Sequence, residues 1–175
     1  EMRVMECPLS RLLPELARIA PSELVVSEAK EADLAGIVSD LGVPLTPLAR
    51  SAFDSQGGER RLCELFSVSM LDAFGSFGRA ELSALGGIVE YLDLTQRGRL
   101  PLLRPPVHEA PARVVQIDAA TRRNLEISQS LSGGREGSLM ATIDRTVTAA
   151  GGRLLERRLA APSRVLSEIA ARHEV

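Results

Sequence analysis

The sequence has 175 residues, of which 45% are hydrophobic and 25% charged, with a formal net charge of −2 at pH 7. This balance excludes a disordered tail and a fibrous repeat, and no uncharged run is long enough to cross a membrane. Neither half of the chain is basic enough to bind a polyanion by charge alone. No signal peptide is recognisable, and the two cysteines lack a CxxC spacing, which suits a reducing compartment.

Alternating strand and helix patterns predict an α/β layout for the first part of the chain. Apolar runs rich in branched residues indicate strands, whereas apolar residues spaced three and four apart indicate helices. The expected strands are residues 2–5, 23–27 and 49–53, and the expected helices are 8–20 and 31–41. Gly42 is the predicted stop of the second helix.

A turn at residues 54–58 is expected to open a further helix, and residues 79–96 give the longest uninterrupted helical pattern. Gly86 and Gly87 lie in the middle of that helix, where each costs about 1 kcal/mol relative to alanine. We therefore expect another element to pack closely over them. The proline-rich stretch 101–111 is typical of a linker.

The last third predicts one strand at residues 113–117 and then several short helices. Four polar residues stand where N-caps are expected, namely Asp118, Ser138, Thr148 and Ser163. Helices this short bury little apolar surface by themselves, so they resemble part of a larger helical body. We predict an α/β domain over residues 1–112 and an all-α segment over 113–175.

Few residues carry recognisable catalytic chemistry. Lys30 is the only lysine and has no glycine upstream, which excludes a GxxxxGK(S/T) phosphate loop. His108 and His173 are far apart in sequence and lack neighbouring ligand types, and Cys7 and Cys63 fit buried structural thiols. We therefore predict no catalytic, cofactor-binding or metal-ligating residue.

Four acidic residues leave one catalytic alternative open. Glu28, Asp54, Asp72 and Asp118 lie at or near the ends of expected strands or apolar runs. Carboxylates at strand ends hold the two metal ions of many nucleases. Asp54 and Asp118 have simpler roles as a turn residue and a helix cap, so a metal-dependent nuclease is the alternative and not the first hypothesis.

Two segments carry a specific family resemblance. Residues 116–127 read QIDAATRRNLEI, and residues 137–155 read GSLMATIDRTVTAAGGRLL. Both resemble the start of the core domain in the MutS family of bacterial mismatch-repair proteins. Upstream, residues 82–96 resemble the last helix of the connector domain of that family, and the resemblance extends over essentially the whole chain.

The resemblance implies a partial ribonuclease H-like connector, with its opening strands missing, followed by the first core helices. It implies an internal segment of a longer protein that couples a mismatch reader to an ATPase and docks the partner MutL. Mismatched DNA, ATP with magnesium, and homodimer formation would belong to the full-length protein. That protein would be cytoplasmic and nucleoid-associated, with no membrane partner.

The exposed side of the 79–96 helix is our predicted partner interface, with Glu81, Glu90, Asp93 and Arg97 as its residues. A second alternative is a stand-alone paralogue that lacks the ATPase. We also expect the segment to self-associate through leucines that lack partners. These leucines are Leu154, Leu155, Leu159 and Leu166.

Overall fold

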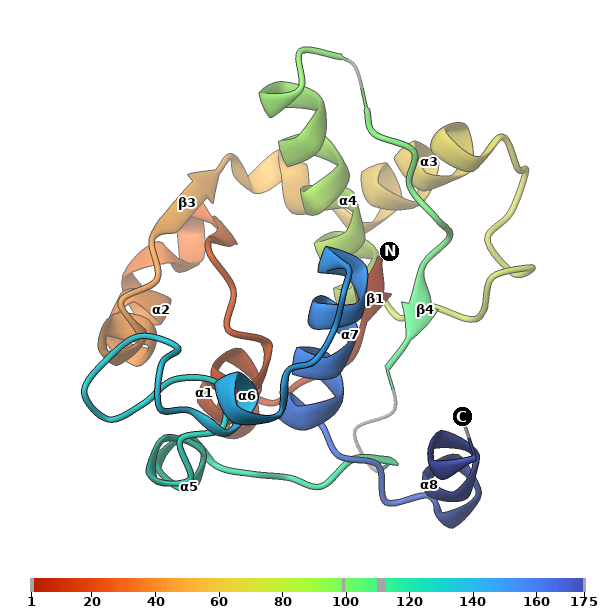
Figure 1. Ribbon diagram of the computed structural model, residues 1–175. Coiled ribbons are helices and arrows are strands. Elements are labelled where there is room, and N and C mark those ends of the chain that lie inside the picture. The colour runs from red at the N-terminus through yellow and green to blue at the C-terminus, as the bar shows by residue number, and fades with distance from the viewer. Residues whose placement is uncertain (1, 99, 110–112, 175) are drawn as a thin grey trace. The chain divides into compact units, whose positions relative to one another are not determined.

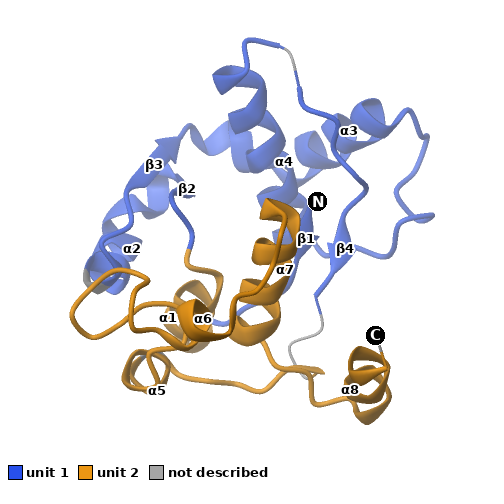
Figure 2. Ribbon diagram, viewed as in Figure 1, with its two compact units in different colours: residues 1–8, 21–109 blue, residues 9–20, 110–175 orange. Residues whose placement is uncertain are grey.

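The computed structural model describes residues 2–98, 100–109 and 113–174 (Figure 1). The chain forms two compact units (Figure 2). Unit 1 comprises Glu1–Pro8 and Pro21–Glu109, and unit 2 comprises Leu9–Ala20 and Ala110–Val175. Unit 1 mixes strands and helices and unit 2 is helical, which confirms the predicted fold class at this coarse level. The units divide the chain differently from the predicted domains at residues 9–20, and the domain boundary at residue 112 stays a prediction.

Unit 1 contains two small parallel sheets. Strand β1 (Arg3–Val4) pairs with β4 (Val107–His108), and β2 (Leu24–Ser27) pairs with β3 (Leu45–Leu48). The predicted strand at residues 49–53 is wrong, because Arg50–Phe53 forms a short 3-10 helix, η3. The strand lies just before it and contains Pro47, which a two-stranded sheet accommodates because each of its strands has an unpaired edge.

The stretch expected to be a linker also differs from its prediction. Strand β4 lies inside it, and Leu100 and Leu103 pack against the core of unit 1. Proline content therefore misled the interpretation here, since Pro106 itself is fully buried. Residues 110–112 of the predicted linker lie outside the described residues.

Three α-helices complete unit 1. They are α2 (Glu31–Val38), α3 (Ser55–Phe66) and α4 (Arg79–Thr95). Short 3-10 turns flank α2, namely η1 (Glu28–Lys30) and η2 (Ser39–Leu41). Gly42 follows with a φ of 63°, the left-handed conformation that ends a helix at glycine, as predicted.

The core of unit 1 joins α3 and α4 to β1. Leu62 is fully buried, and Leu85 and Val89 of α4 pack in one cluster with Met2 and Val4. Burying each such aliphatic side chain stabilises the fold by about 1.5–3 kcal/mol. The apolar side of α4 that carries Leu85 and Val89 therefore faces the core of unit 1.

Glycines set the distance between α3 and α4. A Cβ added to Gly86 would lie 2.4 Å from the Cα of Gly58, and one added to Gly58 would lie 2.3 Å from the Leu82 carbonyl oxygen. A Cβ on Gly87 would lie 2.6 Å from Cε1 of the Phe53 ring. The expected close packing over the glycine pair is confirmed, because the two backbones touch where side chains would normally separate them.

Unit 2 is built from short helices. They are α1 (Leu9–Ile19), α5 (Ala119–Asn124), α6 (Leu139–Ile143), α7 (Ala149–Ala160) and α8 (Leu166–His173). In place of the predicted strand at 113–117, the described part has a single bridge between Val114 and Ser163. Within the described part of the chain, no helix is long and apolar enough to cross a membrane.

Three of the predicted N-caps in unit 2 are confirmed. Side-chain oxygens of Asp118, Ser138 and Thr148 accept hydrogen bonds from backbone N–H groups three residues on, at 2.9, 3.1 and 3.1 Å. The fourth prediction is wrong in detail, because α8 begins after Val165. The Ser163 hydroxyl instead accepts the Val165 N–H and donates to the Glu168 carboxylate at 2.7 Å.

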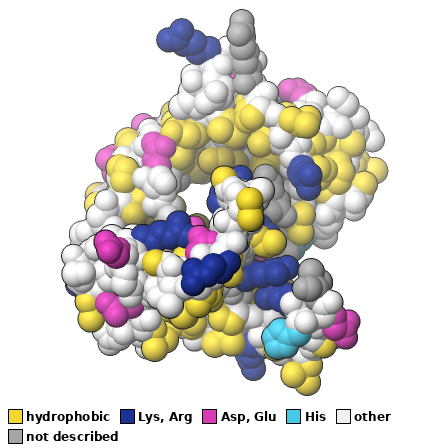
Figure 3. Space-filling view, in the orientation of Figure 1, with side chains coloured by type: hydrophobic (Ala, Val, Ile, Leu, Met, Phe, Trp, Pro, Cys, Tyr) yellow, Lys and Arg dark blue, Asp and Glu magenta, His cyan; other side chains and the backbone are white. Residues whose placement is uncertain are grey.

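Large hydrophobic side chains reach the surface of unit 2. Leu166 is 82% exposed and Val147 is 99% exposed. Leu154 is exposed, whereas Leu155 and Leu159 are half-buried. Hydrophobic side chains (yellow) are visible at many places on the face drawn in Figure 3.

Candidate functional site

The four acidic candidates have ordinary local roles where the structure gives them partners. Glu28 Oε1 accepts the Arg50 N–H at 3.1 Å, and Asp54 Oδ2 accepts the Gly57 N–H at 2.6 Å, which caps α3. Asp118 caps α5, and Asp72 is exposed. Among the described residues, no group of three or more His, Cys, Asp or Glu could hold a metal ion. The geometry therefore gives the nuclease alternative no support.

The predicted interface on α4 divides into two parts. Glu81 Oε2 accepts the Gly78 N–H at 2.8 Å and its Oε1 lies 3.2 Å from His108 Nδ1, while Glu90 forms an ion pair with Arg61 of α3. The Glu81 side chain is only 12% exposed. These two carboxylates hold α4 to its own neighbours, which leaves little of them for a partner.

The C-terminal end of α4 is different. Asp93 and Arg97 are both exposed, and Leu94 between them is 62% exposed. Arg97 adopts a φ of 53° just past the helix, and Gly98 follows with 75°. An exposed leucine beside two opposite charges is a small amphipathic surface. We call these three residues the α4 tip.

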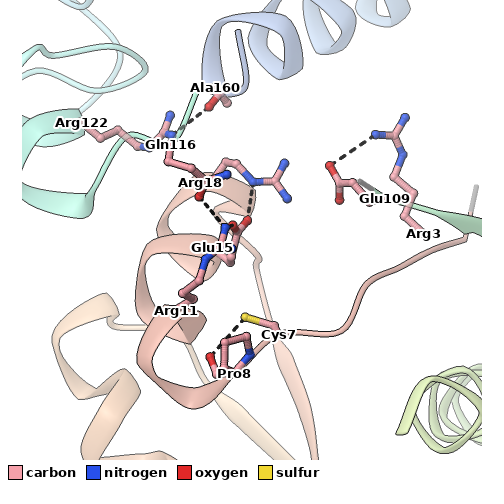
Figure 4. Close-up of polar contacts among 10 residues, drawn as sticks. All are labelled: Arg3, Cys7, Pro8, Arg11, Glu15, Arg18, Glu109, Gln116, Arg122 and Ala160. Carbon is pink, nitrogen blue, oxygen red and sulfur yellow. Dashed lines mark hydrogen bonds and ion pairs between the residues drawn. The ribbon is translucent and has the colours of Figure 1, made fainter. Parts of the chain in front are cut away.

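Unit 2 contains a partly buried ionic network that the sequence analysis missed (Figure 4). Glu15 of α1 is only 4% exposed. Its Oε2 accepts Arg18 Nε at 2.7 Å, and its Oε1 lies 3.2 Å from Arg11 Nη2. The same Arg11 nitrogen donates to Gln116 Oε1 at 2.7 Å, which ties α1 to the segment that leads into α5.

Arg122 is the second buried charge of unit 2. It is 8% exposed, and its Nη2 donates to the carbonyl of Ala160 at the end of α7, at 2.8 Å. Its Nε is buried without a hydrogen-bond partner among the described residues. Burial lowers the pKa of Arg122, the positive charge of Arg18 lowers it further, and the Glu15 carboxylate opposes both effects.

We call Arg11, Glu15, Arg18, Gln116 and Arg122 the Glu15 network. The Glu15 carboxylate bonds to the guanidinium groups of Arg11 and Arg18 and acts only electrostatically on that of Arg122, so the network carries excess positive charge. The only sequence signal was the spacing of Arg11, Glu15 and Arg18, which is equally typical of exposed helix salt bridges. Burial of that face could not be read from the spacing. Figure 4 also shows Arg3 and Glu109 of unit 1, whose charged atoms lie 3.9 Å apart.

Comparison with known protein families matches both parts of the chain. Residues 1–104 match the family model "MutS domain II", and residues 120–175 match "MutS domain III". The two matches leave residues 105–119 between them. Helix α1 lies in the domain II match, and Arg122 and Ala160 lie in the domain III match.

Individual relatives agree with the domain matches. The chain is 63% identical over 169 residues to "DNA mismatch repair protein MutS" of Cereibacter sphaeroides (strain ATCC 17025), covering 97% of this chain. It is 62% identical over 170 residues to the protein of the same name from Paracoccus denitrificans, again over 97% of the chain. In both cases it spans 19% of the relative's length.

These matches define two domains of a DNA mismatch-repair protein. Domains II and III are not the ATPase domain. The chain belongs to the MutS family.

Proposed function

We propose that this chain works within a longer MutS-type mismatch-repair protein, as a non-catalytic element that couples the mismatch-reading part to the ATPase part. Mismatched DNA, ATP with magnesium and homodimer formation belong in this proposal to the longer protein, which would act in the bacterial cytoplasm at the nucleoid. The α/β part would be a partial ribonuclease H-like connector. Its parallel strand pairs are consistent with that arrangement.

The Glu15 network is the observation that supports coupling. Arg11 of α1, in the domain II match, donates to Gln116 just before α5. Glu15 of α1 also acts electrostatically on Arg122 of α5, which lies in the domain III match and donates to Ala160 of α7, all within unit 2. Separating α1 from α5 would take the Glu15 carboxylate away from the buried Arg122 guanidinium, which costs free energy because that charge is poorly solvated. Displacement of one matched domain would therefore be transmitted to the other through these contacts.

A segment exchange tests this proposal. The chain would replace the corresponding segment of the Cereibacter sphaeroides relative, with Arg11→Ala introduced to remove the contact to Gln116. We expect mismatch affinity and ATP hydrolysis to persist, while the change in mismatch affinity caused by ATP shrinks about tenfold, a coupling loss of ordinary size. Arg153→Ala, at an exposed position of α7, is the matched control.

The two variants separate coupling from general damage. Equal ATP responses for Arg11→Ala and the unsubstituted exchange protein would contradict the coupling role. An equal loss in the Arg153→Ala control would show that any arginine removal in this unit disturbs the protein.

A second role, docking of MutL, is supported by the α4 tip, where Leu94 is exposed between Asp93 and Arg97. We propose this smaller surface in place of the full predicted set, since Glu81 and Glu90 have partners within unit 1. Leu94→Asp in the exchange protein should abolish MutL binding in a pull-down with ATP. Leu102→Asp, at another exposed leucine of unit 1, should leave binding unchanged.

Self-association of the isolated chain is the remaining proposal, and the exposed leucines of unit 2 support it. Sedimentation at increasing concentration should detect dimers or larger species. Leu166→Ser should shift the distribution toward monomer, because that side chain is 82% exposed. A monomer at every concentration would contradict this proposal.

A further inference from the structure

Unit 1 contains an open cleft that neither coupling nor docking uses. Its volume is about 870 Å³, and it lies where η1, η3 and the starts of α3 and α4 converge. Three of its lining residues are basic, namely Lys30, Arg50 and Arg79. Each comes from a different element, so the fold gathers charges that are far apart in the sequence.

The basic groups of the cleft are largely available to a ligand. Within the described part of the chain, the guanidinium groups of Arg50 and Arg79 have no hydrogen-bond or ion-pair partner. Lys30 Nζ lies 3.0 Å from Asp33 in an exposed pair, which water screens strongly. The one acidic lining residue, Asp54, already accepts the Gly57 N–H.

The backbone adds to the positive character of this place. Arg79 and Ala80 line the cleft and are the first two residues of the 17-residue helix α4. The first N–H groups of a helix have no partner within the helix, and the helix dipole is positive at this end. Four serines among the lining residues supply hydroxyl donors as well.

We propose that this cleft binds a phosphate group. Guanidinium groups form paired, charge-assisted hydrogen bonds with phosphate oxygens, and two unpaired arginines face the same cleft as a helix N-terminus and serine hydroxyls. The phosphate has two candidate sources, a free phosphorylated metabolite and a DNA backbone, and the two probes below distinguish them. This site is independent of the Glu15 network and of the α4 tip.

The proposal explains how an overall acidic chain can hold an anion. The overall charge of −2 gives no attraction for a polyanion, as the sequence analysis found. Phosphate binding at a cleft depends on local charge, and the lining residues themselves include three cations and one carboxylate. Two further carboxylates lie next to the lining, since Asp33 pairs with Lys30 and Glu28 accepts the Arg50 N–H, so the positive charge is concentrated at Arg50 and Arg79. Lys30 could not belong to a phosphate loop, yet the fold places it at the edge of this cleft.

The test uses the 175-residue chain with pyrophosphate as the first probe, measured by calorimetry. We expect saturable binding, and we expect Arg50→Gln or Arg79→Gln to raise the Kd about tenfold each, because each removes charge-assisted hydrogen bonds. Arg79→Lys should recover part of the loss, since it restores the charge without the planar fork. Arg104→Gln, an exposed arginine of unit 1 outside the cleft, is the matched control.

A labelled single-stranded oligonucleotide is the second probe and identifies the source of the phosphate. Competition with pyrophosphate, together with loss of oligonucleotide binding in Arg50→Gln and Arg79→Gln, would assign a DNA backbone. Pyrophosphate binding that needs both arginines, without oligonucleotide competition, would assign a free phosphorylated ligand. Thermal unfolding of each variant shows that it is folded.

Two results would overturn the proposal. One is the absence of saturable binding for both probes. The other is an equal effect of Arg104→Gln and Arg50→Gln, which would mean attraction to surface charge in general and not to this cleft.

Discussion

The two units are stabilised by different kinds of interaction. Of the twelve buried hydrophobic residues in the described part of the chain, nine lie in unit 1 and three in unit 2. All four of the buried polar or charged residues described belong to unit 2, and they are Glu15, Arg122, Ser138 and Ser163. Unit 1 therefore depends on apolar packing, and unit 2 depends on hydrogen bonds and ion pairs.

This difference decides which conditions each unit tolerates. Apolar burial is insensitive to pH and is strengthened by many salts, whereas paired charges lose their interaction when one partner changes protonation. A buried polar group is also destabilising unless it is bonded, so unit 2 depends on a few specific contacts. The following predictions test this contrast, beginning with the largest expected effect.

Glu15→Gln should destabilise unit 2 by about 3 kcal/mol, because it removes the carboxylate that pairs with Arg18 and that offsets the charge of the buried Arg122. Hydrogen exchange should show faster exchange in α1 and α5, with little change in α3 and α4. Glu136→Gln, at an exposed loop position, is the control and should change stability by less than about 0.5 kcal/mol. Equal effects of the two substitutions would refute the structural importance of the network.

Gly86→Ala should destabilise unit 1 by about 2 kcal/mol, because the new methyl group would overlap the backbone of Gly58. Helix propensity alone predicts the reverse, a gain of about 1 kcal/mol. Denaturant unfolding, detected by amide exchange in α3 and α4, distinguishes the two expectations. A stabilised variant would mean that the helices can separate without loss.

Acidification should affect unit 2 before unit 1. Hydrogen bonds lower the pKa of Asp118, through Thr121, of Asp144, through Thr146, and of Glu168, through Ser163. A carboxyl whose pKa is lower in the folded state stabilises the fold above its ordinary pKa, and this contribution disappears as the pH falls through the folded value.

The lowered pKa values of these carboxyls set the pH range in which unit 2 should lose stability. Protection of unit 2 should be constant near neutrality and should fall below about pH 4, where these carboxylates begin to protonate. Unit 1 has one such group among those described, Glu23, whose pKa is lowered by Thr46 and then Tyr91. Amide exchange measured between pH 7 and pH 3 shows which unit loses protection first. Asp144→Asn should make the protection of unit 2 less dependent on pH. Earlier opening of unit 1 would reverse the comparison.

Gly36→Ala should give the smallest change in stability, and this change should be a stabilisation. Gly36 lies in α2 with nothing within 4 Å of an added Cβ, so alanine should stabilise the helix by about 0.5–1 kcal/mol. It is also the matched control for Gly86→Ala, since both replace a helical glycine. Destabilisation here would mean that glycine serves α2 in some way other than packing.

Local rules predicted much of this fold. The caps at Asp118, Ser138 and Thr148 follow from hydrogen bonds within three residues, and the glycine pair of α4 correctly indicated a close neighbour. The errors concern contacts between distant residues. Strand β4 exists because Val107 and His108 meet Arg3 and Val4, a pairing that no local pattern specifies.

The candidate sites were harder to predict for the same reason. Glu15 sits in an ordinary pattern of helix charges, and only tertiary packing decides that it is buried. Of the four residues predicted for the interface, Glu81 and Glu90 have partners within unit 1 that come from other segments. The cleft around Arg50 combines residues from four parts of the chain, so its charge appears only after folding.

The backbone contact between Gly58 and Gly86 has a mechanical consequence. Most helix pairs are separated by a layer of side chains that can change rotamer and let one helix slide over the other. Where α3 crosses α4 there is no such layer, so a sliding motion would have to break the contact itself. The two helices should therefore move together as one rigid body. A displacement of the α4 tip should displace α3 by a similar amount.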